Sequence, residues 1–136
     1  MLALKSVYSE LINNDENCYR LNKIFDKNNV LSMIQVLNFK GQIYKCLFYR
    51  DGKVLSNISV YNVSTGKEIR NITYRADGKT ISSVREYDLE TEILSNITFF
   101  KEDGVSVSSI IEYSSDGSEV QFSLFCDDGE VISQYL

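Results

Sequence analysis

The chain has 136 residues, 43% of them hydrophobic, and a formal net charge of −5. This length fits one domain with a real core, and the acidic balance argues against a nucleic-acid partner. Histidine is absent, which removes the commonest general base and metal ligand. We therefore expect a single domain over residues 1–136 that holds no metal and no cofactor.

The first segment, residues 1–14, is expected to form one amphipathic helix. Apolar residues recur at helical spacing, with polar residues between them: Leu4, Val7, Tyr8, Leu11 and Ile12. Lys5 and Glu10 interrupt the segment, so it resembles neither a secretory signal nor a membrane span.

Residues 18–50 are expected to supply the first strands, over Cys18–Asp26, Leu31–Lys40 and Gln42–Arg50. The three cysteines, Cys18, Cys46 and Cys126, have no paired spacing, so neither a disulfide framework nor a zinc site is expected. Free thiols favour a reducing compartment, and we expect a cytoplasmic protein.

Residues 51–136 repeat a pattern of turns. Gly52, Gly78 and Gly104 are evenly spaced, and Gly129 follows at nearly the same interval. Asp-Gly dipeptides suit hairpin turns, and they are expected to form them at 51–52, 77–78, 103–104, 116–117 and 128–129. The segments between them are rich in β-forming residues. The pattern predicts an antiparallel up-and-down β-meander of eight to ten strands, built from double-strand repeats of about 26 residues. Glu92 occupies a repeat position where a glycine is expected.

Aromatic residues recur in two rows. One row stands four residues before the glycine of the Asp-Gly turns and comprises Phe48, Tyr74, Phe100 and Phe125; the other row, near the opposite strand ends, comprises Tyr61, Tyr87 and Tyr113. Two interpretations stay open: ladders in which each ring packs on the ring of the next strand, or an exposed strip that binds a partner. We predict that Tyr61, Tyr87 and Tyr113 lie at or near an interface.

Simple alternation assigns side chains to the two sheet faces. It places Ile93, Ile97 and Phe99 opposite Leu94 and Phe100, and it places Val105, Val107, Ile111 and Tyr113 opposite Ile110. Neither face is purely polar. Because one helix covers only part of a wide sheet, the sheet should curl upon itself, dimerise or dock on a partner.

No residue pattern points to catalysis. The acidic groups at the turns, such as Glu102-Asp103, Asp127-Asp128 and Asp116, lack the alternating carboxylates of a calcium loop and are interpreted as turn formers. Cys126 and the carboxylates of Asp88, Glu90 and Glu92 have no partner base or phosphate-binding loop nearby. A carboxylate enzyme stays the least favoured alternative.

The phrase YRADGKTISSVREYDLETEILSNITFFKEDG, residues 74–104, resembles short tandem repeats of unknown function in phytoplasma and Firmicute proteins. More broadly, residues 30–136 resemble the β-meander add-on domain of Gram-positive glycosyltransferases that modify serine-rich adhesins or wall teichoic acid. That resemblance implies a non-catalytic domain that serves oligomerisation or recognition of a glycan or glycoprotein acceptor. The sequence contains no Gly-rich nucleotide loop, so glycosyl transfer itself is not implied.

Two functions follow from this interpretation. The first is a binding module that docks on a protein or glycan partner or on a second copy. The second is a small acidic immunity or antitoxin protein that covers the active site of a toxin. A pull-down distinguishes them by the partner that is captured.

Overall fold

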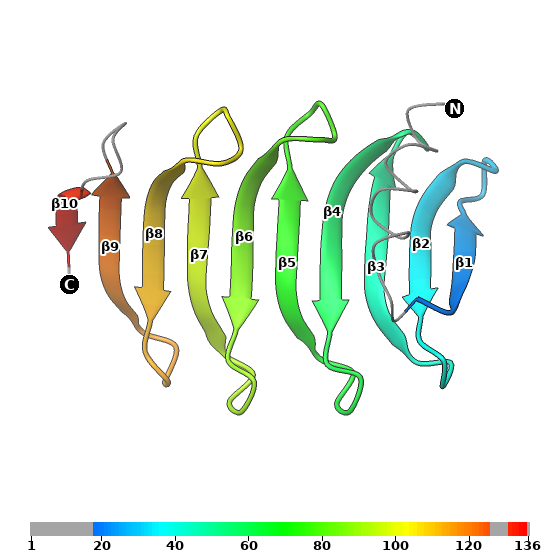
Figure 1. The fold of residues 1–136 in the computed structure, drawn as a ribbon, viewed down its shortest axis with the longest axis horizontal. Helices are drawn as coiled ribbons and strands as arrows, with labels where there is room; N and C mark the ends of the chain where they lie inside the picture. Colours follow the sequence, from blue (N-terminus) through cyan, green and yellow to red (C-terminus); the bar gives the residue numbers. More distant parts are fainter. Residues whose placement is uncertain (1–17, 126–130, 136) are drawn as a thin grey trace.

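The computed structural model describes residues 18–125 and the backbone of residues 131–135. These residues form one antiparallel sheet of ten strands in chain order, with β1 and β10 at its two ends (Figure 1). The predicted up-and-down meander is thus confirmed, whereas the helix predicted over residues 1–14 lies outside the described residues. The strands are β1 (Arg20–Phe25), β2 (Leu31–Leu37), β3 (Ile43–Arg50), β4 (Val54–Tyr61), β5 (Glu68–Tyr74), β6 (Ile81–Tyr87), β7 (Leu94–Phe100), β8 (Val107–Tyr113), β9 (Glu119–Phe125) and β10 (Val131–Tyr135).

Turns stand where the Asp-Gly dipeptides predict them. Gly52, Gly78, Gly104 and Gly117 all have positive φ, between 70° and 89°, a conformation that glycine adopts without steric cost. The turn predicted at 128–129 lies outside the described residues. Glu92, at the position where a glycine is expected, also has a positive φ of 64°.

A β-bulge interrupts every strand pairing near the start of the later strand. In each of the nine pairings the register shifts and skips one residue of that strand: Ser32, Tyr44, Ser56, Ile69, Ser82, Ser95, Ser108, Val120 and Ile132. The hydroxyls of Ser32 and Ser82 donate across the bulge to the carbonyls of Ile24 and Thr73, at 3.2 Å each. A bulge bends its strand and increases the local twist, which suits a wide open sheet.

These bulges correct two of the face assignments made from simple alternation. Val107 pairs with Phe100, and therefore lies on the face of Ile110 rather than on that of Ile111. Leu94 pairs with Tyr87, and therefore lies on the face of Ile97 rather than on that of Phe100. In both strands the skipped serine shifts the alternation by one position.

The hydrophobic core lies on one face of β2–β4. Ile34, Leu47 and Ile58 pair in one row across these strands and are only 1%, 0% and 3% exposed. We call the side that carries this row the core face. The next row along the strands, Gln35, Cys46 and Ser59, points to the other side, which we call the outer face.

The turns form two edges that differ in packing. Turns 51–52, 77–78 and 103–104 make the upper edge in Figure 1, and turns at residues 39–41, 64–66, 90–92 and 116–117 make the lower edge. At the upper edge each hairpin contacts the preceding one. A Cβ on Gly78 would lie 2.8 Å from Val54 Cγ1, and a Cβ on Gly104 would lie 2.7 Å from Thr80 Cγ2. Arg75 Nη2 also donates to the carbonyl of Phe100 at 2.8 Å.

Candidate interaction site

The aromatic rows have a common structural origin. In each pairing, one residue at or next to the end of the earlier strand lies opposite the bulge of the later strand. This residue is aromatic in eight of the nine pairings and is Leu37 in the other. These residues alternate between the two faces from strand to strand: Phe25, Leu37, Tyr49, Tyr61, Tyr74, Tyr87, Phe100, Tyr113 and Phe125. Their burial differs: Tyr49 is only 9% exposed, whereas Phe25 is 50% exposed.

Tyr61, Tyr87 and Tyr113, the predicted interface residues, all lie on the outer face at the lower edge and are half-buried. They stand on β4, β6 and β8, so another strand separates each ring from the next, at about 9.6 Å for two strand spacings. Their cross-strand partners are Glu68, Leu94 and Glu119. The row is therefore not a ladder in which ring packs on ring from one strand to the next.

One member of the other aromatic row was assigned to the wrong residue. Tyr49, not Phe48, pairs across the bulge as Tyr74 and Phe100 do, whereas Phe48 lies on the outer face opposite Asn57. The cause is a shorter turn. This loop is one residue shorter than the loop around Gly78, and both of its central residues, Asp51 and Gly52, have positive φ, 53° and 73°.

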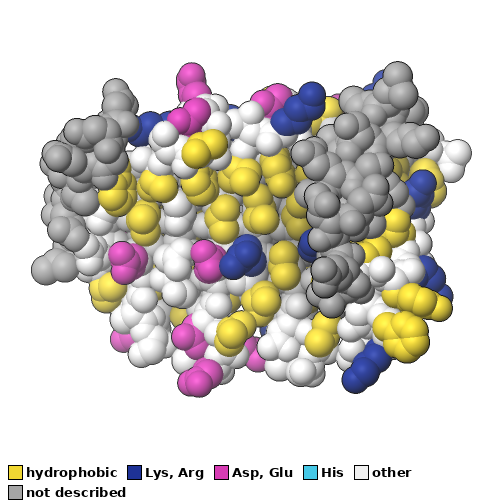
Figure 2. All heavy atoms as spheres, in the orientation of Figure 1, with side chains coloured by type: hydrophobic (Ala, Val, Ile, Leu, Met, Phe, Trp, Pro, Cys, Tyr) yellow, Lys and Arg dark blue, Asp and Glu magenta, His cyan; other side chains and the backbone are white. Residues whose placement is uncertain are grey.

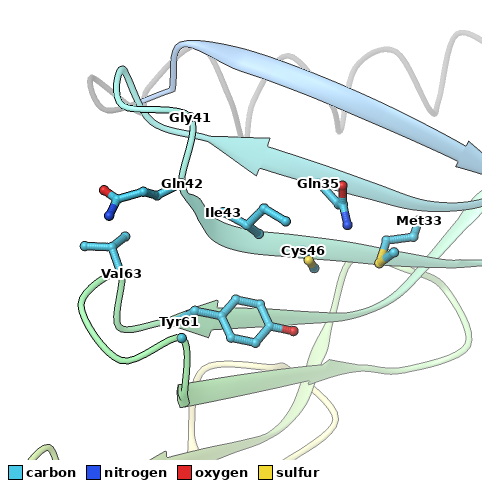
Figure 3. A pocket seen from close by; sticks show the side chains of 9 residues that line it. Met33, Gln35, Gly41, Gln42, Ile43, Cys46, Tyr61 and Val63 are labelled. Atoms are coloured by element: carbon cyan, nitrogen blue, oxygen red, sulfur yellow. The ribbon is translucent and has the colours of Figure 1, made fainter.

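A groove opens on the outer face beside Tyr61 (Figure 3). Its volume is about 540 Å³, and its lining residues are Met33, Gln35, Gly41, Gln42, Ile43, Cys46, Tyr61, Val63 and Gly66. Gln35 and Cys46 are cross-strand partners on β2 and β3. Gln42 lies at the rim, where Asn38 Nδ2 donates to its Oε1 at 2.9 Å and leaves the Gln42 amide NH₂ as a donor.

The side chains that line the groove carry no formal charge at neutral pH. Burial raises the pKa of the Cys46 thiol, and a hydrogen bond with Tyr61 partly offsets that rise. Burial likewise raises the pKa of Tyr61. Both groups are therefore uncharged at pH 7, and none of the lining side chains is ionic. A protonated thiol is a poor nucleophile, so the groove offers amide and hydroxyl dipoles beside an apolar floor rather than reactive chemistry.

The acidic turns use their carboxylates internally. Asp103 Oδ1 accepts from the backbone N–H groups of Val105 and Ser106 at 2.8 Å each, and Asp77 does the same for Lys79 and Thr80 at 2.9 and 2.8 Å. The hydroxyl hydrogen bonds of Thr80 to Asp77 and of Ser106 to Asp103, followed by these backbone hydrogen bonds, lower the pKa of both aspartates to about 2. No group of three or more potential metal ligands occurs among residues 18–125.

The groove residues other than Tyr61 escaped prediction from the sequence. Met33 and Gln35 alternate with the core residues Ile34 and Val36 on β2, which marks them as outer-face positions but gives no sign of a hollow. Tyr61 reaches Cys46 from a neighbouring strand, and only the pairing of β3 with β4 reveals it.

Comparison with known protein families gives one match over part of the chain. Residues 48–99, from β3 into β7, match DUF2963, a family of proteins of unknown function. No curated protein sequence matches the chain.

Solved glycosyltransferase structures contain a similar fold. A TarM mutant from S. aureus in complex with fondaparinux, alpha-GlcNAc-glycerol and UDP matches with a TM-score of 0.56, at 10% identity over 90% of this chain. The GtfA/B complex bound to UDP and GlcNAc matches with a TM-score of 0.59, at 12% identity over 90% of this chain. This chain spans only 22% and 25% of those chains, respectively. At such identities the likeness establishes the fold alone.

Proposed function

We propose that the chain is a non-catalytic interaction module, an accessory domain that mediates oligomerisation or acceptor recognition for a glycosyltransferase. One observation carries the proposal: the likeness to TarM and GtfA/B covers 90% of this chain but no more than 25% of theirs. The meander is therefore one part of a larger protein in those structures.

The outer face supplies suitable contacts. Tyr61, Tyr87 and Tyr113 align along one edge, and tyrosine offers a large apolar area with a polar end, which suits an interface. The groove beside Tyr61 extends this row with neutral hydrogen-bonding groups. The groove itself, whose lining holds no ionic side chain, suits an uncharged partner group or a glycan acceptor better than an ionic ligand.

The cellular setting belongs to the same proposal. Cys18 and Cys46 are thiols rather than halves of a disulfide, and Cys126 lies outside the described residues. No helix within residues 18–125 has the length and hydropathy that a membrane span requires. We expect the module to act in the cytoplasm, and thiol counting in denaturant without reductant should find three free groups.

The experiment combines association with partner capture. Tyr87→Ala should weaken self-association, or capture of a glycosyltransferase chain, about tenfold, because interface tyrosines often contribute more than about 1 kcal/mol. The control is Tyr49→Ala, which removes a ring from the same position beside a bulge on the core face, where it is only 9% exposed. This control should lower the melting temperature but leave association unchanged.

Two outcomes would contradict the proposal. Capture of one basic toxin that the chain inhibits would identify an immunity protein instead. Equal effects of Tyr87→Ala and Tyr49→Ala on stability, with sedimentation and capture unchanged, would show that the tyrosine row is only structural. Tyr87→Phe keeps the ring beside the bulge and should fold in either case.

A further inference from the structure

A band of apolar side chains continues the core across the second half of the sheet. Figure 2, which views the core face, shows hydrophobic side chains gathered over β5–β9. We call this set the apolar band; its members are half-buried and comprise Ile72, Tyr74, Ile81, Val84, Phe100, Val107, Ile110 and Phe125.

The band and the core belong to the same rows of the sheet. Ile58 pairs with Ile72, and Ile72 pairs with Val84, so the apolar row that begins at Ile34 and Leu47 runs on to β6. Thr98 then interrupts it on β7 before Ile110 resumes it on β8. Exposure changes along it, from at most 3% for Ile34, Leu47 and Ile58 to half-buried for Ile72 and Val84. Side chains of the same chemistry are therefore covered over β2–β4 and open over β5–β9.

The dimensions of the band distinguish between two possible occupants, a folded protein and a single α-helix. The band is two rows of side chains deep. Each row occupies about 7 Å along the strands, so the band is about 14 Å deep, and it extends over about 19 Å from β5 to β9. Its footprint is therefore roughly 250 Å², far below the roughly 800 Å² that each partner buries in a stable complex of two folded proteins. One α-helix, about 10 Å across and about 13 residues long over that distance, matches it.

The charged residues beside the band indicate which side chains the helix should carry on its flank. Arg70, Glu86 and Glu112 border the band along its lower side, in one row of the core face. Arg70 Nη2 already pairs with Glu86 Oε2 at 3.5 Å, whereas Glu112 is exposed, so this border has a net charge of −1. On the opposite border, Lys79 and Lys101 stand near Asp77 and Asp103, so that border favours neither sign.

From these features we propose that the apolar band binds an amphipathic helix of a partner protein, with lysine or arginine on the flank that faces the border row of Arg70, Glu86 and Glu112, whose net negative charge comes from Glu112. The inference rests on the proposed interaction function, but it concerns the core face rather than the tyrosine row. Burial of an apolar stripe supplies affinity, and the basic flank fixes which way the helix lies.

The test uses two designed peptides, each long enough to form a helix that spans the band. Both peptides carry the same stripe of leucines; one has lysine along one flank of the helix, and the other has glutamate there. The full chain should bind the lysine peptide with induction of helical circular dichroism, and should bind the glutamate peptide several-fold more weakly. Val84→Lys should weaken binding at least tenfold. Ser83→Lys, on the outer face of the same strand, should leave it unchanged. Glu112→Lys, an exposed change that spares the fold, should reverse the preference between the peptides.

Other results would overturn this assignment. Equal binding of both peptides by the Glu112→Lys protein would remove the role of charge, and Val84→Lys binding as well as Ser83→Lys would place the helix elsewhere. A wild-type dimer that Val84→Lys converts to a monomer would show that a second copy occupies the band. Since Tyr87 lies on the outer face, Tyr87→Ala should not affect peptide binding, so failure here is separable from failure of the tyrosine row.

Discussion

The two edges of the sheet use the same backbone conformation for different reasons. On the upper edge, Gly78 and Gly104 combine positive φ with close approach to the preceding hairpin, 2.8 Å and 2.7 Å for an added Cβ. On the lower edge, Gly41 and Gly66 also have positive φ, but an added Cβ would meet no atom within 4 Å. The lower edge accepts Glu92 at an equivalent position. Contact with a neighbouring hairpin, rather than the left-handed conformation alone, is thus what requires glycine.

Alanine at glycine positions should separate the edges most strongly. Gly78→Ala should lower the free energy of unfolding by about 2–4 kcal/mol, because positive φ costs an L-residue roughly 1–2 kcal/mol and overpacking adds more. Gly66→Ala should cost only about 1 kcal/mol, because conformational strain acts alone. Urea denaturation of both variants measures the difference. Equal losses would show that the hairpin contact contributes nothing.

The hydrogen bond between hairpins on the upper edge should have the next largest effect. Arg75 Nη2 donates to the part-buried carbonyl of Phe100, and Arg75→Ala should lower the free energy of unfolding by about 1.5 kcal/mol, near the value for a charged donor. Arg85→Ala, which removes an exposed arginine from the outer face, serves as the control and should have little effect. If both variants unfold at the same denaturant concentration, stacking of the hairpins does not depend on this bond.

Low pH should destabilise turns on the two edges to a similar extent, in contrast to the glycine substitutions, which should affect the edges differently. Asp77 on the upper edge and Asp116 on the lower edge both have a folded-state pKa of about 2, because each accepts hydrogen bonds within its own turn. A lowered pKa stabilises the fold above the ordinary aspartate range near 4, and this contribution disappears as the pH falls through 2. Asp77→Asn and Asp116→Asn should therefore lower the melting temperature by similar amounts at pH 7 and by much less at pH 2. A pH-independent loss would contradict this account.

The smallest expected effect is a change on the lower edge. Glu92→Gly should change the free energy of unfolding by no more than about 0.5 kcal/mol, because relief of positive φ is offset by the greater entropy of glycine in the unfolded chain. The opposite change at the equivalent lower-edge turn, Gly66→Glu, should be tolerated, whereas Gly78→Glu on the upper edge should unfold the protein. Thermal unfolding of the three variants compares them directly, and a folded Gly78→Glu protein would refute the distinction between the edges.

Sequence patterns predicted the strands and turns well because these features are local. Asp-Gly dipeptides and β-forming segments act over short stretches of chain, and the dipeptides located the turns at Gly52, Gly78, Gly104 and Gly117 without the structure. Face assignments failed at Leu94 and Val107 because alternation assumes an unbroken register, whereas a bulge follows each turn. Serine at Ser32, Ser56, Ser82, Ser95 and Ser108, near the start of five strands, is the signal that would have revealed it.

The groove escaped prediction for a different reason. Cys46 and Tyr61 belong to different strands, and nothing in either segment of the sequence indicates that they meet. Their contact depends on the register of β3 against β4, which the bulge opposite Tyr49 sets. Tyrosines could be proposed for an interface from their chemistry, but the hollow beside one of them is a property of the paired strands.

The alternation of the aromatic residues between faces also limits how such a protein can change in length. Insertion of a single strand with its turn would move every later hairpin to the other edge and every later ring to the other face, so the first displaced hairpin would lose the preceding hairpin on which its glycine packs. Duplication or loss of a strand pair preserves both. Variation in length among relatives should therefore occur in steps of one complete double-strand repeat, with an even number of strands gained or lost.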